Sequence, residues 1–171
     1  MGSIKCLEPI IDKDTKILIL GTIPGGDSLA NKRYYDNRDN IFWDIMFRIF
    51  NKNWSMDDLV HECDINYNIK IKLLLENKIG LWDVIKSCNR KGNSDSEIKN
   101  PIYNDFNKLF IEYPQIKKII FSSKEAYKHY KKEIEHPQHI SFEILYSTSS
   151  LCPINTFYVF RQWKNALIGK Q

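Results

Sequence analysis

The chain has 171 residues, 43% of them hydrophobic and 13% aromatic, so it can bury a core without disulfide or metal support. The formal net charge of +4 is compatible with nucleic-acid binding but does not require it. No run reaches the ~18 apolar residues of a membrane span, and residues 1–6 lack the apolar core of a secretion signal. We therefore expect a single domain over residues 1–171, located in the cytoplasm and not attached to a membrane.

Two elements are predicted in the first 51 residues. Ile17–Leu20 is a short apolar run that stops at Gly21, which is typical of a buried strand. Asn40–Asn51 repeats apolar side chains at helical spacing, which predicts an amphipathic helix. Asn40 stands at its start, where an asparagine side chain can cap the first turn.

The next fifty residues predict helices, a strand and a long loop. Ser55 is a candidate N-cap for helical segments that run to Lys78 and end at Gly80. Leu81–Ile85 is short and apolar and predicts a second strand. Lys86–Pro101 is polar and contains glycine, serine and asparagine, so we expect a loop there.

The remainder of the chain alternates helices with strands. The predicted elements are a helix around Phe106–Phe110, a strand Lys117–Phe121, a helix Ser123–Glu135, a strand Phe142–Tyr146 and a helix Asn155–Ile168. In the last helix the side chains expected to share one face are Phe157, Phe160, Trp163 and Leu167. This alternation predicts a three-layer αβα sandwich around a four-stranded, mostly parallel sheet.

The stretch GTIPGGDSLANKRYYDNRDNIFW, residues 21–43, is the most informative part of the sequence. It begins with a glycine-rich loop directly after the first predicted strand. It goes on to a tyrosine pair and, five residues after Tyr35, reaches Asn40. Backbone N–H groups, an aromatic ring and an amide are thus expected at the carboxyl end of a strand, where open α/β sheets build their sites.

Three blocks of sequence, in the same order, resemble the uracil-DNA glycosylase superfamily. The most similar branch is that of the deoxyinosine (hypoxanthine) DNA glycosylases, and the resemblance runs from about residue 16 to the C-terminus. The first block comprises Gly21, Thr22, Pro24, Gly25, Ser28, Leu29, Tyr34, Tyr35, Asn40, Phe42 and Trp43. The second comprises Leu81 to Val84, Cys88 to Arg90, Gly92, Asp95 and Asn104 to Phe106, and the third is Ser147-Thr148-Ser149.

This resemblance implies a monofunctional DNA glycosylase that hydrolyses the N-glycosyl bond of a deaminated base, hypoxanthine or uracil, during base excision repair. The implied partner is DNA with the damaged nucleotide flipped out, and we expect a monomer that needs no cofactor.

One branch of the superfamily holds an iron–sulfur cluster on four cysteines. Here the four cysteines lack the close ligand spacing of such a cluster, so no metal is expected. They are Cys6, Cys63, Cys88 and Cys152.

Asn40 is the predicted catalytic residue. In many relatives the third residue of the first motif is Asn or Asp and handles the attacking water, but here that position is Ile23. The matched branch also has an apolar residue there, and it assigns the functional role to the asparagine that corresponds to Asn40. An amide is a weak base, so its role would be to orient water or to stabilise charge on the departing base.

Seven residues are predicted to bind the base: Thr22, Ile23, Pro24, Gly25, Tyr35, Asp83 and Ser122. Tyr35 keeps the spacing to Asn40 at which relatives place a base-stacking ring. Asp83 lies towards the end of the second predicted strand, where some relatives carry an Asn that reads the base edge. As an anion it would accept a hydrogen bond from a ring N–H, although a purely structural carboxylate is an equal alternative.

The loop after the last strand is predicted to bind DNA through Ser147, Thr148, Ser149, Ser150 and Leu151. Its small hydroxyl side chains suit a phosphate, and Leu151 suits an apolar wedge between bases. Arg90 is among the loop cations expected to be available to phosphates.

Two alternatives remain open, and the first of them is motivated by loop residues near the predicted site that depart from the branch pattern. Asn37-Arg38-Asp39 replaces His-Pro-Arg, Phe121-Ser122-Ser123 replaces Phe-Asn-Gly, and Ser150-Leu151 replaces Pro-Ala. One alternative is a non-catalytic DNA-binding module on the same fold. The other is a small-molecule or nucleoside hydrolase.

Overall fold

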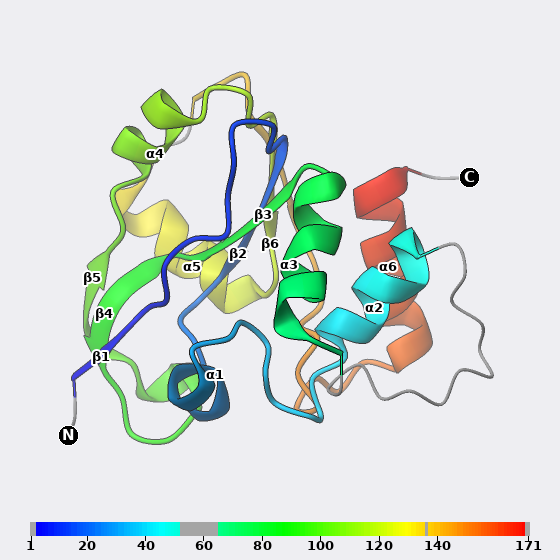
Figure 1. Ribbon diagram of the computed structural model, residues 1–171. Helices are drawn as coiled ribbons and strands as arrows, with labels where there is room; N and C mark the ends of the chain where they lie inside the picture. The colour runs from blue at the N-terminus through cyan, green and yellow to red at the C-terminus, as the bar shows by residue number, and fades with distance from the viewer. Residues whose placement is uncertain (1–2, 52–64, 136, 170–171) are drawn as a thin grey trace.

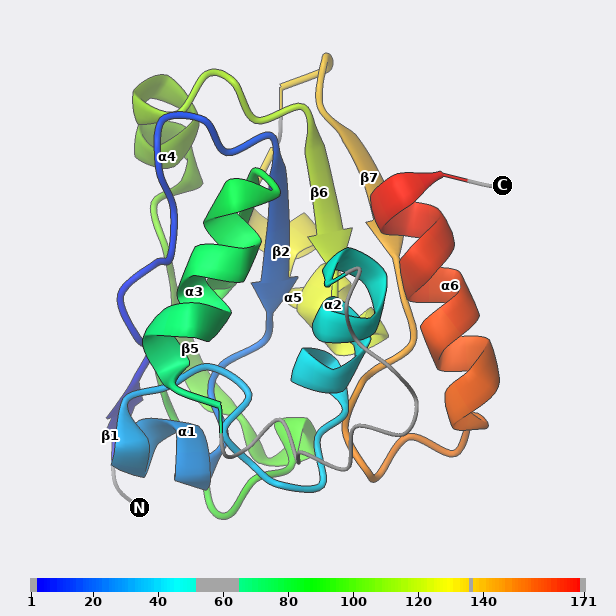
Figure 2. The same cartoon turned by 45° about the vertical axis from the view of Figure 1, so that its right-hand side comes forward.

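The computed structural model describes residues 3–51, 65–135 and 137–169. Its central sheet has the strand order β3-β2-β6-β7, and all neighbouring strands are parallel. The bounds are Ile17–Gly21 for β2, Ile79–Asp83 for β3, Lys118–Phe121 for β6 and Ser141–Ile144 for β7. Figure 2 shows β2 and β6 running side by side in the same direction.

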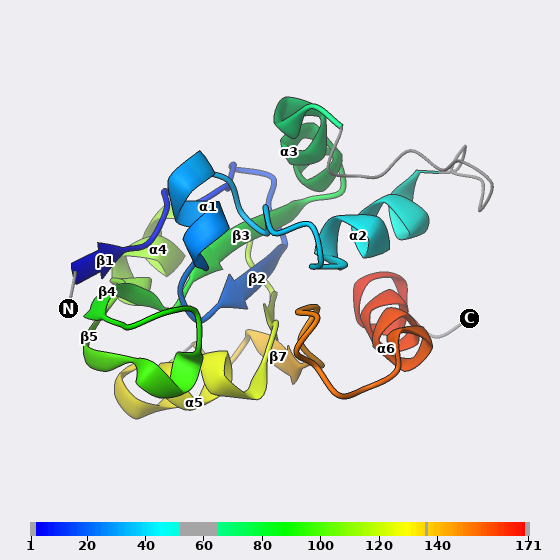
Figure 3. The same ribbon diagram turned by 90° about the horizontal axis from the view of Figure 1, so that it is seen from below.

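Helices cover both faces of this sheet, which confirms the predicted three-layer sandwich (Figures 1 and 3). One face carries α2 (Phe42–Phe50), α3 (Tyr67–Glu76) and α6 (Thr156–Ile168). The other carries α4 (Phe106–Glu112) and α5 (Lys124–Glu133). A short helix, α1 (Gly26–Asn31), follows β2.

The two cores follow from the alternation of side chains along buried strands. In β2, Ile19 points into the core beneath α2, α3 and α6, whereas Leu18 and Leu20 point into the core beneath α4 and α5. All three side chains are fully buried. Strands covered on both faces read as continuous apolar runs, and for this reason β2 and β6 were predictable from sequence.

The prediction of a loop over Lys86–Pro101 is wrong. This region contains β4 (Ile85–Asn89), a 3₁₀ turn (Asp95–Glu97) and β5 (Lys99–Tyr103). With β1 (Ser3–Lys5) these strands form a second, antiparallel sheet in the order β1-β4-β5. Register shifts in the β4–β5 pairing disturb the two-residue alternation, so the usual sequence signal of a half-buried strand is missing.

Gly80 does not end a helix, as the sequence suggested, but lies inside β3. The helix before it ends at Glu76, and Lys78 adopts the left-handed conformation with φ 61°. A side chain on Gly80 would come within 3.0 Å of the Ile10 carbonyl oxygen and of the Thr15 methyl group. Gly80 is therefore needed for close approach of the chain, since Ile10 bridges to Leu81 beside it.

The helices predicted to begin at Ser123 and Asn155 are α5 and α6, and each of these two residues caps its helix by accepting a hydrogen bond from a first-turn N–H. Phe157, however, is 62% exposed and does not share the buried face of α6. That face is formed by Val159, Trp163 and Ala166, with Phe160 and Leu167 half-buried beside it. The predicted cap Ser55 lies outside the described residues.

Among the helices of the described ranges, none combines the length and the apolar character that crossing a membrane requires.

We predict that Gly80→Ala lowers the free energy of unfolding by about 1–3 kcal/mol, the usual cost of overpacking a core. The added methyl group would meet the Ile10 backbone and the fully buried Thr15 side chain at 3.0 Å, so one of them must shift. Urea denaturation measures the change. Gly26→Ala is the control, because its nearest neighbour is the exposed Asn93 side chain at 3.3 Å. A Gly80→Ala protein as stable as the Gly26→Ala protein would contradict the prediction.

Candidate functional site

The loops that follow the four parallel strands enclose one cavity of about 790 Å³. Figure 3 looks onto this end of the sheet. Every residue that the sequence placed in the site lines this cavity, so the three sequence blocks converge at one end of the sheet. They are Thr22, Ile23, Pro24, Gly25, Tyr35, Asn40, Asp83, Ser122, Ser147, Thr148, Ser149, Ser150 and Leu151. Their individual roles stay predictions.

Asn40 is held at the start of α2 by two local contacts. Its Oδ1 accepts a hydrogen bond from the Phe42 N–H at 3.0 Å, so the side chain satisfies the first N–H of the helix from the position before the N-cap, Ile41. The neighbouring Ile41 N–H donates to the carbonyl oxygen of Thr148 at 3.0 Å, which ties the last loop of the site to the same helix. Because the amide oxygen of Asn40 accepts from the Phe42 N–H, the N–H donors of the amide are the groups of Asn40 that remain to bind a ligand in the cavity.

Tyr35 presents its ring to the cavity from a backbone conformation that is unusual for a bulky residue, with φ 54°. The ring stacks on Phe42, with centroids 3.9 Å apart and planes 15° apart. Its hydroxyl is hydrogen-bonded to Ser122. These two contacts fix the ring between α2 and the end of β6, as a stacking platform requires.

Tyr34, the other member of the tyrosine pair, has a structural role. It is 5% exposed and belongs to the core beneath α2. Its hydroxyl donates to the Leu7 carbonyl oxygen at 3.2 Å, and its own carbonyl accepts from the Trp43 indole N–H at 2.9 Å. The tight packing of Tyr34 therefore helps to hold Tyr35 in place.

Asp83 lies at the bottom of the cavity and is only 3% exposed. Its Oδ2 has no hydrogen-bond partner among the described residues. The pKa of this carboxyl is raised to about 8: desolvation raises it most, the charge of Asp95 adds to this, and the Arg90 guanidinium lowers it. These surroundings favour the neutral form of Asp83 at neutral pH, whereas the sequence suggested an anion, because the sequence did not reveal how completely the group is desolvated.

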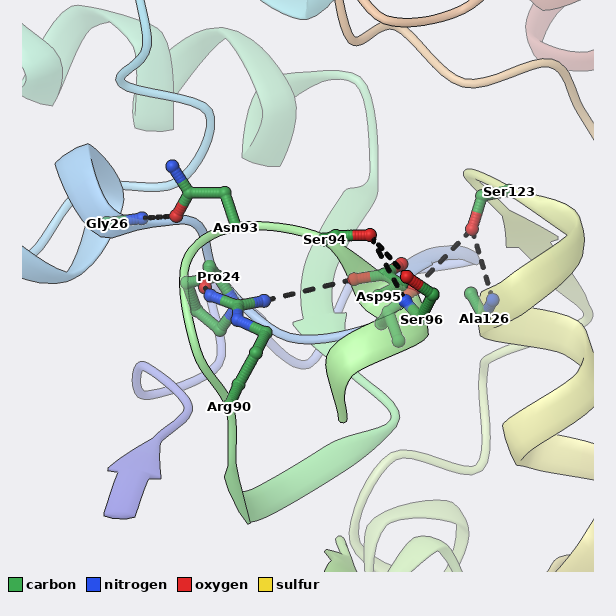
Figure 4. Close-up of polar contacts among 10 residues, drawn as sticks. Pro24, Gly26, Arg90, Asn93, Ser94, Asp95, Ser96, Ser123 and Ala126 are labelled. Carbon is green, nitrogen blue, oxygen red and sulfur yellow. Dashed lines mark hydrogen bonds and ion pairs between the residues drawn. The ribbon is translucent and has the colours of Figure 1, made fainter. Parts of the chain in front are cut away.

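Arg90 is buried, which corrects the expectation that it is available to phosphates. Its side chain is 2% exposed, donates to the Pro24 carbonyl oxygen at 2.6 Å and lies 3.8 Å from Asp95 Oδ1 (Figure 4). Arg90 thus holds the glycine-rich loop in place through a buried contact with its backbone. Nearby, Asn93 Oδ1 accepts from the Gly26 N–H at 2.8 Å and ties the same loop to the second sheet.

The segment from Asn93 to Asp95 is part of the cavity wall that sequence reasoning missed. The side chain of Asp95 is hydrogen-bonded to Thr22, so it contacts one of the predicted base-binding residues. The available signal was the spacing of Gly92 and Asp95 in the second block, to which no role had been given.

The loop from Ser147 to Leu151 is braced by its own hydroxyl groups. Ser147 Oγ accepts from the Ser149 N–H at 3.2 Å, and Ser149 Oγ accepts from the Leu151 N–H at 3.3 Å. Leu151 is 84% exposed at the cavity rim, as a wedge residue would be. Thr148 is 2% exposed, so its side chain belongs to the inner wall rather than to a phosphate-binding surface.

Residues 3–51, 65–135 and 137–169 contain no group of three or more His, Cys, Asp or Glu side chains placed to hold a metal ion. Within these ranges Cys6, Cys88 and Cys152 are free thiols. Cys63 lies outside them.

Comparisons with known proteins agree with this geometry. The model of the uracil DNA glycosylase superfamily matches residues 8–166. The hypoxanthine DNA glycosylase of Methanosarcina barkeri is 37% identical over 118 residues, which are 69% of this chain and 70% of the relative. The protein of the same name from Methanosarcina acetivorans is 36% identical over 117 residues, 68% of this chain and 69% of the relative.

A solved structure extends the similarity to the whole fold. The solution NMR structure of a proposed uracil DNA glycosylase from Methanosarcina acetivorans superimposes with a TM-score of 0.80 at 28% identity, and the match covers 97% of both chains. The family model spans nearly the entire chain, and the cavity combines the residues of all three sequence blocks. The chain belongs to the uracil-DNA glycosylase superfamily.

Proposed function

We propose that this protein is a monofunctional DNA glycosylase that hydrolyses the N-glycosidic bond of a deaminated base, hypoxanthine or uracil, in DNA. The observation that carries the proposal is a single cavity in which an amide, a stacking ring and a buried carboxyl meet beneath an exposed leucine. The names of the two curated relatives support the same activity. The cavity volume lies in the range of small-molecule pockets, so it can accept an extruded nucleotide.

The reaction needs the base out of the stack and stabilisation of the charges that form as the bond breaks. Tyr35 offers a ring face to hold the base, and Leu151 can fill the space that the base leaves. Asn40 supplies amide N–H donors, which can orient water or polarise the base. Ile23 cannot do this work, because it is 7% exposed and packs in an apolar cluster with Ile85 and Cys88.

The assignment is tested by incubating the protein with oligonucleotides that carry deoxyinosine, deoxyuridine or deoxyxanthosine, and measuring base release. Release of a free base from at least one of them is expected. Binding to damaged and undamaged duplex without release would favour a non-catalytic module. Hydrolysis of free deoxyinosine in the absence of DNA would favour a nucleoside hydrolase.

A second readout tests the monofunctional part of the proposal. Lys124 at the start of α5 contributes to the cavity lining, but its side chain is exposed, whereas an amine nucleophile is usually activated by desolvation. Borohydride should therefore trap no covalent protein–DNA complex. A trapped complex would show a Schiff base and contradict hydrolysis by water alone.

We predict that Asn40→Ala lowers the single-turnover rate of excision by ~10²-fold or more, the scale of losing one oriented polar group in a preorganised site. Loss of the cap costs only about 1 kcal/mol of stability, so the variant should fold and bind DNA. Asn40→Ser is the matched control, because serine keeps the capping oxygen but removes the amide. If Asn40→Ser is fully active and Asn40→Ala is merely less stable, Asn40 is a cap and not a catalytic residue.

We predict that Tyr35→Ala weakens excision of every lesion by about 1–3 kcal/mol, because stacking does not depend on the identity of the base. Single-turnover rates on deoxyinosine and deoxyuridine duplexes measure the loss. Tyr35→Phe keeps the ring but loses the hydrogen bond to Ser122, and it should stay close to the wild-type rate. A Tyr35→Phe variant as slow as Tyr35→Ala would assign the role to the hydroxyl instead of the ring.

A further inference from the structure

A buried carboxyl group without a hydrogen-bond partner requires an explanation, because such groups are rare in folded proteins. Asp83 is buried at the end of β3, and its Oδ2 has no partner among the described residues. The backbone carbonyl of Asp83 accepts a hydrogen bond from the Asn104 side chain at 2.8 Å, which fixes the residue in position. The carboxyl is therefore held in place with an unsatisfied oxygen, and it lines the cavity.

The absence of a side chain on Gly21 leaves room for the Asp83 carboxyl at the cavity. The parallel register of β2 and β3 places Gly21 opposite Asp83. A Cβ atom on Gly21 would lie 2.5 Å from Asp83 Oδ1 and 3.7 Å from the Tyr35 hydroxyl. The carboxyl thus folds over the bare Cα of Gly21, and it shares this spot with the hydroxyl of the predicted stacking ring.

The groups around Asp83 favour its neutral form. The pKa of the Asp83 carboxyl is raised to about 8, with desolvation as the largest cause, Asp95 adding to it and Arg90 opposing it. Arg90 is itself engaged by the Pro24 carbonyl and by Asp95, so its charge is shared.

The other titratable groups that face Asp83 carry no charge at neutral pH. Burial raises the pKa values of Cys6, Tyr34 and Tyr35 above their ordinary values, which keeps the thiol and both hydroxyls protonated. Within the described part of the chain, Arg90 is the one cation that lowers the Asp83 pKa, so a carboxylate at this place would be poorly compensated.

We propose that Asp83 acts in the site as a neutral carboxylic acid, whose hydroxyl donates a hydrogen bond to a carbonyl oxygen of the extruded base. This inference rests on the proposed glycosylase function and assigns a chemical role to one residue of that site. The anionic alternative would accept from a ring N–H and would repel the lone pairs of a carbonyl oxygen. The two forms therefore read opposite features of the base.

The chemistry of the leaving group favours the donor. As the N-glycosidic bond breaks, the bonding electron pair stays with the base, and its ring system spreads the negative charge onto the carbonyl oxygen. A neutral donor placed there stabilises that charge, whereas a carboxylate would oppose it in a cavity of low polarity. Hypoxanthine, uracil and xanthine all carry such an oxygen at a position where adenine, cytosine or guanine carries an amino group. The substrate class implied is thus bases in which deamination has created a carbonyl.

The test is the pH profile of single-turnover excision from deoxyinosine and deoxyuridine duplexes between about pH 5.5 and 9.5. The wild-type rate should fall about tenfold per pH unit once Asp83 ionises, above about pH 8. Asp83→Asn keeps an N–H donor that does not titrate, so its rate should be lower than wild type at pH 6 but show no such fall. Asp83→Ala should be at least about tenfold slower than Asp83→Asn at pH 6.

The matched control is Asp39→Asn, which makes the same charge change at an exposed loop position and should keep the alkaline fall of the wild type. A wild-type rate that stays constant or rises from pH 6 to 9 would overturn the proposal. So would an Asp83→Asn variant that is no faster than Asp83→Ala, since its amide would then not replace the acid.

A readout independent of activity separates this inference from the proposed function. Asp83 ionises near its ordinary pKa when unfolded but near 8 when folded, so between these values unfolding releases a proton. The urea midpoint of the wild type should therefore fall relative to Asp83→Asn as pH rises from 5 to 8. A constant difference would mean that Asp83 is ionised in the fold and would overturn the neutral acid alone. Absence of excision by the wild type would overturn the glycosylase function, and the base contact with it.

Discussion

The pairing of Gly21 with Asp83 across β2 and β3 is the constraint on which the rest of the site depends. It places a carboxyl over a residue that has no side chain, at the end of a strand that is buried on both faces. Desolvation raises the pKa of the carboxyl to about 8, and its Oδ2, unpartnered among the described residues, is left to the cavity. The backbone register thus fixes the position of this group, and burial by the surrounding segments favours its neutral form.

The second sheet gives this arrangement its rigidity. Arg90 follows β4 and donates to the Pro24 carbonyl, and Asn93 accepts from the Gly26 N–H, so the glycine-rich loop is tied at its middle and at its end. On the opposite side, Thr148 is bonded to the start of α2 beside Asn40. Groups that stabilise charge in a transition state must not reorganise during the reaction, and these contacts supply that preorganisation.

The sequence was sufficient for the parts of the structure in which one signal dominates. β2 and β6 are apolar runs between polar flanks, and Ser123 and Asn155 stand where helix caps should stand. The small sheet escaped prediction because register shifts in β4 break the alternation that marks a strand. Gly80 was misinterpreted because its reason is a tertiary contact with Ile10, which lies far away along the chain.

The candidate site divides in the same way. The residues that line the cavity could be predicted, because each of the three sequence blocks follows a strand and the carboxyl ends of parallel strands lie together. The charge state of Asp83 and the internal position of Arg90 could not, since both depend on burial by distant segments. A charged residue in a sequence is usually exposed to solvent, and only the packing of the folded chain shows which charged residues are buried.

The role of Asp83 as a neutral donor is tested most directly by a structure of the protein bound to a duplex that carries 2′-fluoro-2′-deoxyinosine, in which the N-glycosidic bond resists cleavage. We expect the base to lie in the cavity against the Tyr35 ring, with its carbonyl oxygen about 2.5–3.0 Å from the Asp83 carboxyl. A base that remains stacked in the duplex, or one that turns a ring N–H toward Asp83, would contradict it.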